Sequence, residues 1–223
     1  MSILSDYTTE NYLKAIVKHL ANPDHRRITT GELAALVNVT SGTATSMMKK
    51  LQKEGYVLYL SHQGCTLTEQ GAEYGLRILR RHRLLETFLV TMLGLGLEEA
   101  HQEAERLEHS ASDSLIDTIA EKLGNPTKDP NGNMIPAKKQ NSFTLTDRSL
   151  LQAPLQAEVV ISRISSNSKM AVYLQNEGIV VGQRCEVLAV DTEVGVAHIL
   201  VEGEEKSLSV KALEALFYER PSA

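Results

Sequence analysis

Apolar residues recur with helical spacing through most of the first 123 positions. Residues 5–20 carry apolar side chains at intervals of four, which predicts an amphipathic helix. The sequence Thr29-Thr-Gly-Glu32 has the spacing of a capping box, which predicts that a short helix begins there and runs through Val37. A third helix is expected over residues 41–54, because Gly55 stands where a glycine commonly ends a helix.

Two short apolar runs follow this third helix. Residues 57–60 and 65–67 are separated by a turn that contains Gly64, which predicts a β-hairpin. Three helices followed by a hairpin are the order of a winged helix-turn-helix, whose third helix commonly lies in the DNA major groove. Small hydroxyl residues in that helix suit close approach to bases, and the lysines suit phosphate. The candidate DNA-binding residues are Ser41, Gly42, Thr43, Thr45, Ser46, Lys49 and Lys50. The alternative is that the hydroxyl residues only begin a helix and the lysines only aid solubility.

Two longer helices are expected over residues 69–92 and 98–123. Their apolar faces are broader than an internal core requires, which favours a homodimer interface. Residues 124–147 are rich in Gly, Pro and Asn, which predicts a turn-rich connection and a domain boundary there. Beyond it, apolar residues alternate with a period of two, apart from a short helix expected over 170–176.

The alternating segments are residues 185–190, 194–201 and 206–210, separated by Asp-Thr-Glu and Glu-Gly-Glu turns. This pattern predicts a small antiparallel β-barrel. The expected fold class is therefore mainly α with a C-terminal β-barrel.

Composition narrows the class of protein. The 223 residues are 42% hydrophobic and 23% charged, as in an ordinary globular protein. No apolar run approaches the roughly 18 residues that a transmembrane helix needs, and the first residues do not form a secretory signal. Cys65 and Cys185 are too isolated to suggest a disulfide framework. We therefore expect a cytoplasmic protein with no membrane partner.

The formal net charge of −5 hides a local asymmetry. Residues 41–83 contain seven Lys and Arg against three Asp and Glu, a balance of +4, whereas residues 98–123 contain two against eight, a balance of −6. A basic segment beside an acidic one suits a protein that touches phosphate with one part and binds cations with another. Solvated helix faces of opposite sign are the alternative.

The acidic segment contains candidate metal ligands. At about 100° per residue, His101, Glu105 and Glu108 would share one narrow face of a helix, with His109 at its edge. Imidazole and carboxylate groups beside an apolar stripe suit a divalent metal. In the preceding helix, His82 and Glu86 are four residues apart, so they would lie on neighbouring turns of one face. The alternative for each histidine is a surface or satisfied core residue, which is the interpretation favoured for His198.

Several segments together carry a resemblance to a known family. They are Thr8-Thr-Glu-Asn-Tyr-Leu13, the winged helix through Leu67-Thr-Glu-Gln-Gly71, Arg81-His82-Arg-Leu-Leu-Glu86, Glu105-Arg-Leu-Glu108-His109-Ser-Ala-Ser-Asp113 and Asp129-Pro-Asn-Gly-Asn-Met-Ile-Pro136. In this order, they resemble the diphtheria-toxin-repressor and manganese-transport-regulator family of metal-dependent transcription factors. The resemblance is dense over residues 7–136, and the C-terminal part resembles the family's SH3-like (FeoA-like) domain by pattern and position.

The resemblance implies two neighbouring metal sites. A primary site would use Asn11, Glu105, Glu108 and His109, and an ancillary site would use His82, Glu86 and His101. Iron-type members have cysteine where Glu105 stands and methionine where Asn11 stands. Manganese-type members usually have aspartate at the Asn11 position and another acid at Lys14. In longer members the SH3-like domain adds a carboxylate and an amide ligand, whereas Ser165-Ser-Asn167-Ser-Lys-Met170 offers no obvious pair here.

These observations predict a regulator that binds DNA in response to a divalent metal and represses metal-uptake genes. The expected domains are 1–72 (winged helix-turn-helix), 73–140 (helical metal-binding and dimerisation domain) and 141–223 (linker and SH3-like domain). Ligands without sulfur favour Mn²⁺ or Fe²⁺, although Zn²⁺ or Co²⁺ would bind in vitro. The expected partners are a palindromic double-stranded operator and a second copy of the chain, with no small organic substrate.

Two other function classes remain open at this point. A winged-helix regulator could respond to an organic ligand, with Glu105 and His109 forming salt bridges only. A metallohydrolase could use similar ligands, although the chain has no His-Glu-x-x-His sequence and no Gly-rich phosphate loop.

The acidic residues also suggest how a metal would act. Without metal, Glu86, Glu105 and Glu108 are expected to repel one another and leave the DNA-binding helices loosely placed. A cation would neutralise them, tie Asn11 to the acidic helix and fix the spacing of two recognition helices at about one turn of DNA, ~34 Å. Metal and DNA binding would then be coupled reciprocally.

Overall fold

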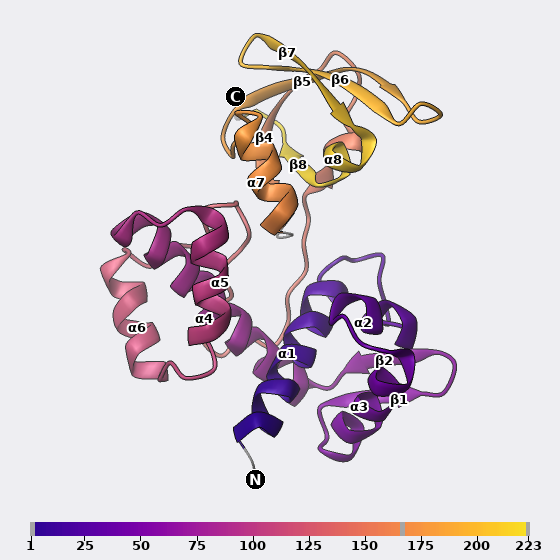
Figure 1. Cartoon of the computed structure of the whole chain (residues 1–223), viewed down its shortest axis with the longest axis vertical. Helices are drawn as coiled ribbons and strands as arrows, with labels where there is room; N and C mark the ends of the chain where they lie inside the picture. The colour runs from indigo at the N-terminus through magenta and orange to yellow at the C-terminus, as the bar shows by residue number, and fades with distance from the viewer. Residues whose placement is uncertain (1–2, 166–167, 222–223) are drawn as a thin grey trace. The chain divides into compact units, whose positions relative to one another are not determined.

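A computed structural model describes residues 3–165 and 168–221 of the chain, so Asn167 lies outside the described residues. The N-terminal part contains three helices and a hairpin (Figure 1). These elements are α1 (Ile3–Leu20), α2 (Thr30–Leu36), α3 (Ser41–Lys53), β1 (Val57–Leu60) and β2 (Gly64–Leu67). The order predicted from the sequence is confirmed.

Local signals fix the ends of these helices. The Thr29 side chain accepts from the backbone N–H of Glu32 while the Glu32 carboxylate accepts from the Thr29 N–H, which is the predicted capping box. The Thr40 side chain caps α3 in the same way, through the N–H of Thr43. Gly55 follows α3 with φ of +82°, a conformation that glycine adopts without strain. The starts of α2 and α3 and the end of α3 are therefore determined by residues close to them in the sequence.

An apolar core joins the N-terminal elements. Leu13 and Ile16 of α1, Met48 and Leu51 of α3 and Val57 of β1 are all buried within it. The hairpin strands pair antiparallel, with Val57 opposite Leu67. The core fixes α1 against α3, and so determines where the polar side chains of α1 lie.

Three helices follow the hairpin: α4 (Glu69–Leu93), α5 (Leu97–Leu107) and α6 (Asp113–Lys122). The prediction of one continuous helix over 98–123 is wrong. Ser112 begins α6, because its side chain accepts from the N–H of Leu115 and its carbonyl accepts from the N–H of Ile116. Glu108 and His109 therefore lie in the connection between α5 and α6, which Figure 1 shows as separate helices.

The connection after α6 contains a tight loop around Asp129. The Asp129 side chain accepts from the backbone N–H groups of Asn131 and Asn133, both at 2.9 Å. The backbone carbonyl of Asn131 accepts from the N–H of Ile164 in a strand of the C-terminal part. Gly132 has φ of +79°, and a Cβ atom there would lie 2.2 Å from the Ser162 carbonyl oxygen, so only glycine fits this close approach.

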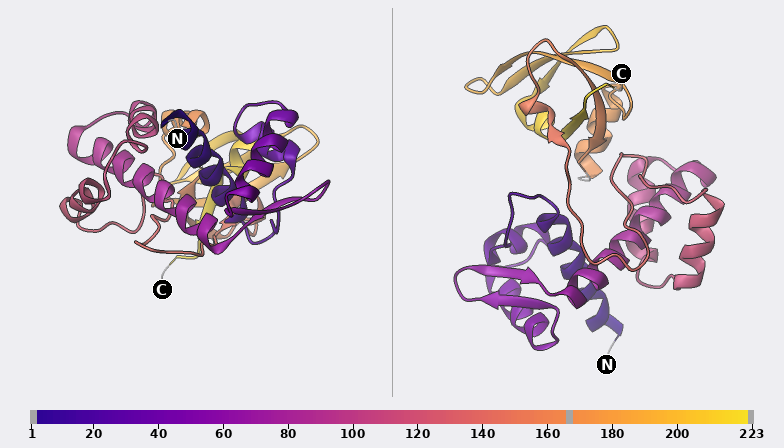
Figure 2. Two further views of the ribbon diagram at one scale, coloured as in Figure 1. Left: turned by 90° about the horizontal axis from the view of Figure 1, so that it is seen from below. Right: turned by 180° about the vertical axis from the view of Figure 1, so that it is seen from behind.

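The C-terminal part is a six-stranded sheet with two short helices. Its elements are β3 (Arg148–Ser149), the 3-10 turn η1 (Leu150–Gln152), β4 (Glu158–Ile164), α7 (Ser168–Asn176), β5 (Arg184–Asp191), β6 (Val196–Val201), β7 (Glu204–Ser209), α8 (Val210–Glu214) and β8 (Leu216–Glu219). The strand order is β3-β8-β4-β5-β6-β7, and the paired strands are antiparallel. Helix α7 contributes Leu174 and helix α8 contributes Leu213 to the apolar core of this part. Figure 2 shows its strands and helices from two further sides.

This sheet confirms part of the predicted fold class. Mainly helical elements are followed by a strand-rich C-terminal part, as expected. Strands β3 and β7 stand at the two ends of the strand order, so hydrogen bonding among the described strands does not close the expected barrel. No helix in the described residues combines the length and hydropathy that a membrane span requires.

Candidate metal centre

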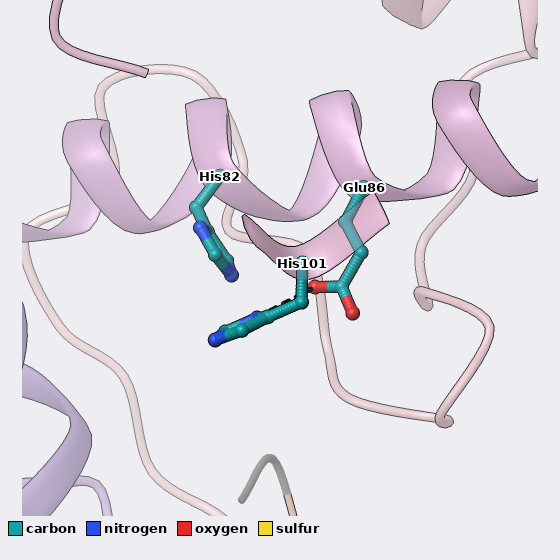
Figure 3. Close-up of side chains that lie close together, drawn as sticks. All are labelled: His82, Glu86 and His101. Carbon is teal, nitrogen blue, oxygen red and sulfur yellow. Dashed lines mark ion pairs between the residues drawn. The ribbon is translucent and has the colours of Figure 1, made fainter. Parts of the chain in front are cut away.

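Helices α4 and α5 bring three candidate ligands together. His82 and Glu86 lie one turn apart on α4, and His101 comes from α5 (Figure 3). One potential ligand atom from each of these residues lies within 4.8 Å of the others. His82 and Glu86 are buried, and His101 Nδ1 is 3.9 Å from a Glu86 carboxylate oxygen. Two imidazoles and a carboxylate that converge in this way have the donor chemistry to hold a divalent cation.

A second group shares His82 with the first. It consists of His82, Glu105 and Glu108, again with one potential ligand atom from each within 4.8 Å of the others. His82 Nδ1 is 2.8 Å from Glu108 Oε2 and 3.7 Å from Glu105 Oε1. Glu108 is fully buried, whereas the Glu105 side chain is 38% exposed. The imidazole of His82 therefore connects the two groups.

His109 is held beside the second group by a residue that the sequence analysis did not single out. Its Nδ1 lies 2.5 Å from Glu10 Oε2, and its Nε2 lies 3.4 Å from Glu108 Oε1. The ring also stacks on Tyr7, with centroids 4.8 Å apart. A carboxylate on one ring nitrogen that leaves the other directed toward a ligand site is the usual support for a metal-binding histidine.

The environment of Glu10 stabilises its charged form. Burial raises the pKa of this carboxyl group, but hydrogen bonds with His109 and Tyr74, together with the positive charges of His109 and Arg81, outweigh burial and lower it overall. Tyr74 donates to Glu10 Oε1 at 2.9 Å. Burial and this hydrogen bond to a carboxylate raise the pKa of Tyr74 to about 12. Glu10 is thus an ionised acceptor for both neighbours at neutral pH.

Lys14 changes the expected charge balance of the acidic group. Its Nζ atom donates to Glu105 Oε1 at 2.8 Å and to Glu108 Oε1 at 2.5 Å, and the side chain is buried. The expectation that Glu105 and Glu108 are left to repel one another is therefore wrong, because a lysine from α1 lies against both.

Asn11 differs in burial from the residues beside it. It is exposed, whereas its neighbours Glu10 and Tyr12 are buried. Six of the seven predicted ligands lie in or beside the two groups that share His82, and the seventh, Asn11, is an exposed residue of α1. Glu10 is the residue of this segment that reaches His109.

The loop around Asp129 also contacts the first group. Asn131 is buried and its side-chain Nδ2 lies 3.5 Å from Glu86 Oε1. Because the backbone carbonyl of Asn131 accepts a hydrogen bond from the N–H of Ile164, the loop joins Glu86 to strand β4 of the C-terminal sheet.

The candidate DNA-binding residues lie on the first three turns of α3. Ser41, Gly42, Thr43, Ser46 and Lys49 are exposed, and Thr45 and Lys50 are partly buried. The hydroxyl groups of Thr45 and Ser46 donate to the carbonyls of Ser41 and Gly42, which leaves their oxygens able to accept. Lys50 Nζ lies 3.3 Å from Thr9 Oγ1 and 3.8 Å from Glu54 Oε1, so Lys49 is the more available cation for phosphate.

Comparison with known proteins extends these observations. A family model for the iron-dependent repressor N-terminal DNA-binding domain matches residues 6–65, and one for the metal-binding and dimerisation domain of the same repressors matches residues 68–137. An HTH-type transcriptional regulator of Methanocaldococcus jannaschii is 41% identical over 110 residues, which are 49% of this chain and 87% of the relative.

Two further similarities bear on the metal. The HTH-type transcriptional regulator MntR of Lysinibacillus sphaericus is 36% identical over 112 residues, which are 50% of this chain and 78% of that protein. The solved structure of a manganese-dependent transcriptional repressor in complex with manganese aligns with a TM-score of 0.87 at 34% identity. That alignment covers 96% of this chain and 100% of the other, so it includes the C-terminal sheet.

Proposed function

Because this chain belongs to the iron-dependent repressor family of metal-dependent transcriptional regulators, we propose that it binds operator DNA with a divalent metal as corepressor. The family is one of transcriptional repressors, not of enzymes. The observation that carries the proposal is the convergence of His82, Glu86 and His101, from two helices, on one position. Repression of metal-uptake genes is the expected consequence.

Two adjoining positions would hold the metal. His82, Glu86 and His101 supply two imidazoles and a carboxylate, and Glu105 and Glu108 supply carboxylates beside the same His82. His109 belongs to the second position, where Glu10 directs its ring. Asn11, which is exposed on α1, stays a predicted ligand of this position. A bound cation would supply positive charge at carboxylates from α4, from α5 and from the α5–α6 connection.

Nitrogen and oxygen donors without sulfur favour Mn²⁺ or Fe²⁺ among the metals available to a cell. Zn²⁺ and Co²⁺ would also bind such ligands in vitro, because affinity generally rises along the first-row series from Mn²⁺ through Fe²⁺ and Co²⁺ to Cu²⁺ before it falls at Zn²⁺. The relatives include proteins named for manganese and for iron. We propose Mn²⁺ or Fe²⁺ as the corepressor.

Helix α3 is the proposed reading element. Its exposed Ser, Gly and Thr residues would approach bases, and Lys49 and Lys50 would bind phosphate. Small side chains make few direct base contacts, so DNA shape would contribute to specificity. Two copies of the chain would present two such helices to a palindromic operator in the cytoplasm. Domains at 1–72, 73–140 and 141–223, the last of them SH3-like, are the proposed division.

The test is a gel-shift titration with a palindromic operator fragment, run with Mn²⁺, Fe²⁺, Zn²⁺ and chelator. Tight binding with metal and weak binding with chelator is the expected result. In His101→Ala, added metal should no longer strengthen operator binding, because the variant lacks one of the three converging ligands. His198→Ala, an exposed histidine of β6, is the matched control and should behave as wild type. Equal affinity for the operator fragment with metal and with chelator would contradict the proposal.

A further inference from the structure

The buried ammonium group of Lys14 lies at the oxygens that a metal would use. It is 2.8 Å from Glu105 Oε1 and 2.5 Å from Glu108 Oε1, and Lys14 and Glu108 are 6% and 0% exposed. On the other side of the same carboxylate, His82 Nδ1 is 2.8 Å from Glu108 Oε2. The chain therefore supplies its own cation to the group that His82, Glu105 and Glu108 form.

We infer that Lys14 is a tethered competitor of the metal: it holds the Glu105 and Glu108 carboxylates in the metal-free chain, and a divalent cation binds that pair only by displacing it. The inference rests on the proposed function, since it concerns how the same site is filled. Lys14 would then help to determine the metal concentration at which the Glu105 and Glu108 carboxylates bind a cation.

Competition follows from the chemistry of the ammonium group. A protonated lysine has three N–H donors and no lone pair, so it cannot ligate the metal beside the carboxylates. A cation that takes the same two oxygens needs the space that the ammonium group occupies. Two positive charges at such short range repel each other, the more so because the side chains of Lys14 and Glu108 are out of contact with water.

The two groups of ligands should then differ in affinity. In the described part of the chain, Lys14 forms ion pairs with Glu105 and Glu108, and neither residue belongs to the group of His82, Glu86 and His101. The cost of displacing Lys14 therefore applies to one group and not to the other. We expect a tighter position at His82, Glu86 and His101 and a weaker one at Glu105 and Glu108.

Lys14 also connects helix α1 with the end of α5, because its partner Glu105 lies in the last turn of α5 and its partner Glu108 directly follows that helix. If the salt bridge only stabilises the fold, its removal should lower stability and leave metal affinity unchanged. A competitor raises metal affinity when it is removed. The sign of the change in affinity therefore separates the two roles.

The first experiment measures metal affinity and stoichiometry in the full chain by Mn²⁺ titration calorimetry. In Lys14→Met, the weaker position should tighten at least about tenfold, which is about 1.4 kcal/mol. Lys14→Arg keeps the positive charge and should retain the affinity of the wild type. Lys18→Met removes the same charge one turn further along α1 and is the matched control. It should also leave the affinity unchanged.

The second experiment needs no variant. In the metal-free protein labelled with ¹⁵N-lysine, the hydrogen-bonded ammonium group of Lys14 should give a slowly exchanging Nζ–H signal. Addition of Zn²⁺, which is diamagnetic, should remove this signal as the second equivalent binds. The signal is identified by its absence from Lys14→Arg. This measurement keeps the inference testable if Lys14→Met fails to fold without metal, since removing one partner of a buried ion pair is costly.

The outcomes separate the inference from the proposed function. If the wild type binds no divalent metal, the proposed function fails. If it binds metal while Lys14→Met has unchanged affinity and the Lys14 signal persists at saturation, the competitor role is overturned and the regulator remains. Tightening in Lys14→Met with loss of the signal in the wild type supports the inference.

Discussion

Glu10 determines how His109 presents its ring nitrogens, because its carboxylate occupies Nδ1 and leaves Nε2 toward Glu108. Glu10→Gln should weaken Mn²⁺ binding at the second position about 10- to 100-fold, as loss of a supporting carboxylate commonly does. Titration calorimetry measures the change. Glu32→Gln, in the capping box of α2, is the control and should lower stability while leaving metal affinity unchanged. Unchanged affinity in Glu10→Gln would contradict the role.

The pH dependence of stability gives a separate test of Glu10. Its pKa in the folded, metal-free chain is lowered from the ordinary value of 4.5. A lowered carboxyl pKa contributes stability that is present above the unfolded-state value and is lost as the pH falls through the folded-state value. The difference in Tm between wild type and Glu10→Gln should therefore be full at pH 7 and shrink below about pH 4.5. If the Tm difference between wild type and Glu10→Gln stays the same from pH 7 to below pH 4.5, the lowered pKa of Glu10 does not contribute to stability.

Side-chain spacing predicted part of the site. His82 and Glu86 could be placed on one face because four residues separate them on a helix. The partners of His109 and Glu108 could not be predicted in this way. Glu10 and Lys14 are 99 and 94 residues away from them in the chain, and their contacts depend on how α1 packs. No local pattern encodes such a contact.

The helices of the N-terminal part were predictable because their ends carry local signals, such as the capping box at Thr29. The break between α5 and α6 was missed because apolar residues continue at helical spacing across it, and only Ser112 marks the new beginning. Strand β4 was missed because four consecutive residues, 161–164, are buried and leave no alternation to detect. Its partner β8 has four residues, too few for a period to show.

Lys49 tests whether α3 binds DNA as proposed. It is exposed on that helix, so its ammonium group is available to phosphate. Lys49→Ala should weaken operator binding with metal and reduce the slope of log affinity against log salt by about 1 per protomer. Gel shifts over a series of salt concentrations measure the slope. Lys211→Ala, exposed on α8, should leave it unchanged. An unaltered slope in Lys49→Ala would place the phosphate contact elsewhere.

The whole molecule is expected to act as a dimer. The region that matches the dimerisation-domain model, residues 68–137, leaves large apolar side chains in contact with solvent. They are Met92 (56% exposed), Leu93 (57%), Leu107 (42%), Leu115 (49%) and Met134 (43%). Apolar groups at the end of α4 and on the following helices are what a second copy would cover. Such a dimer would place two α3 helices about one turn of DNA apart, ~34 Å.

Charges placed in this apolar surface should separate the protomers. The double variant Met92→Glu/Leu93→Glu removes apolar burial worth about 3 kcal/mol or more, so the dimer Kd should rise by roughly 100-fold. Light scattering coupled to size exclusion measures the mass, and sedimentation gives the Kd. Leu155→Glu/Val194→Glu, two side chains of the C-terminal part with similar or greater exposure, should remain dimeric. The separated protomers should bind a half-site weakly even with metal, because only the paired helices gain from the palindrome. A double variant that stays dimeric would show that the interface lies on another surface.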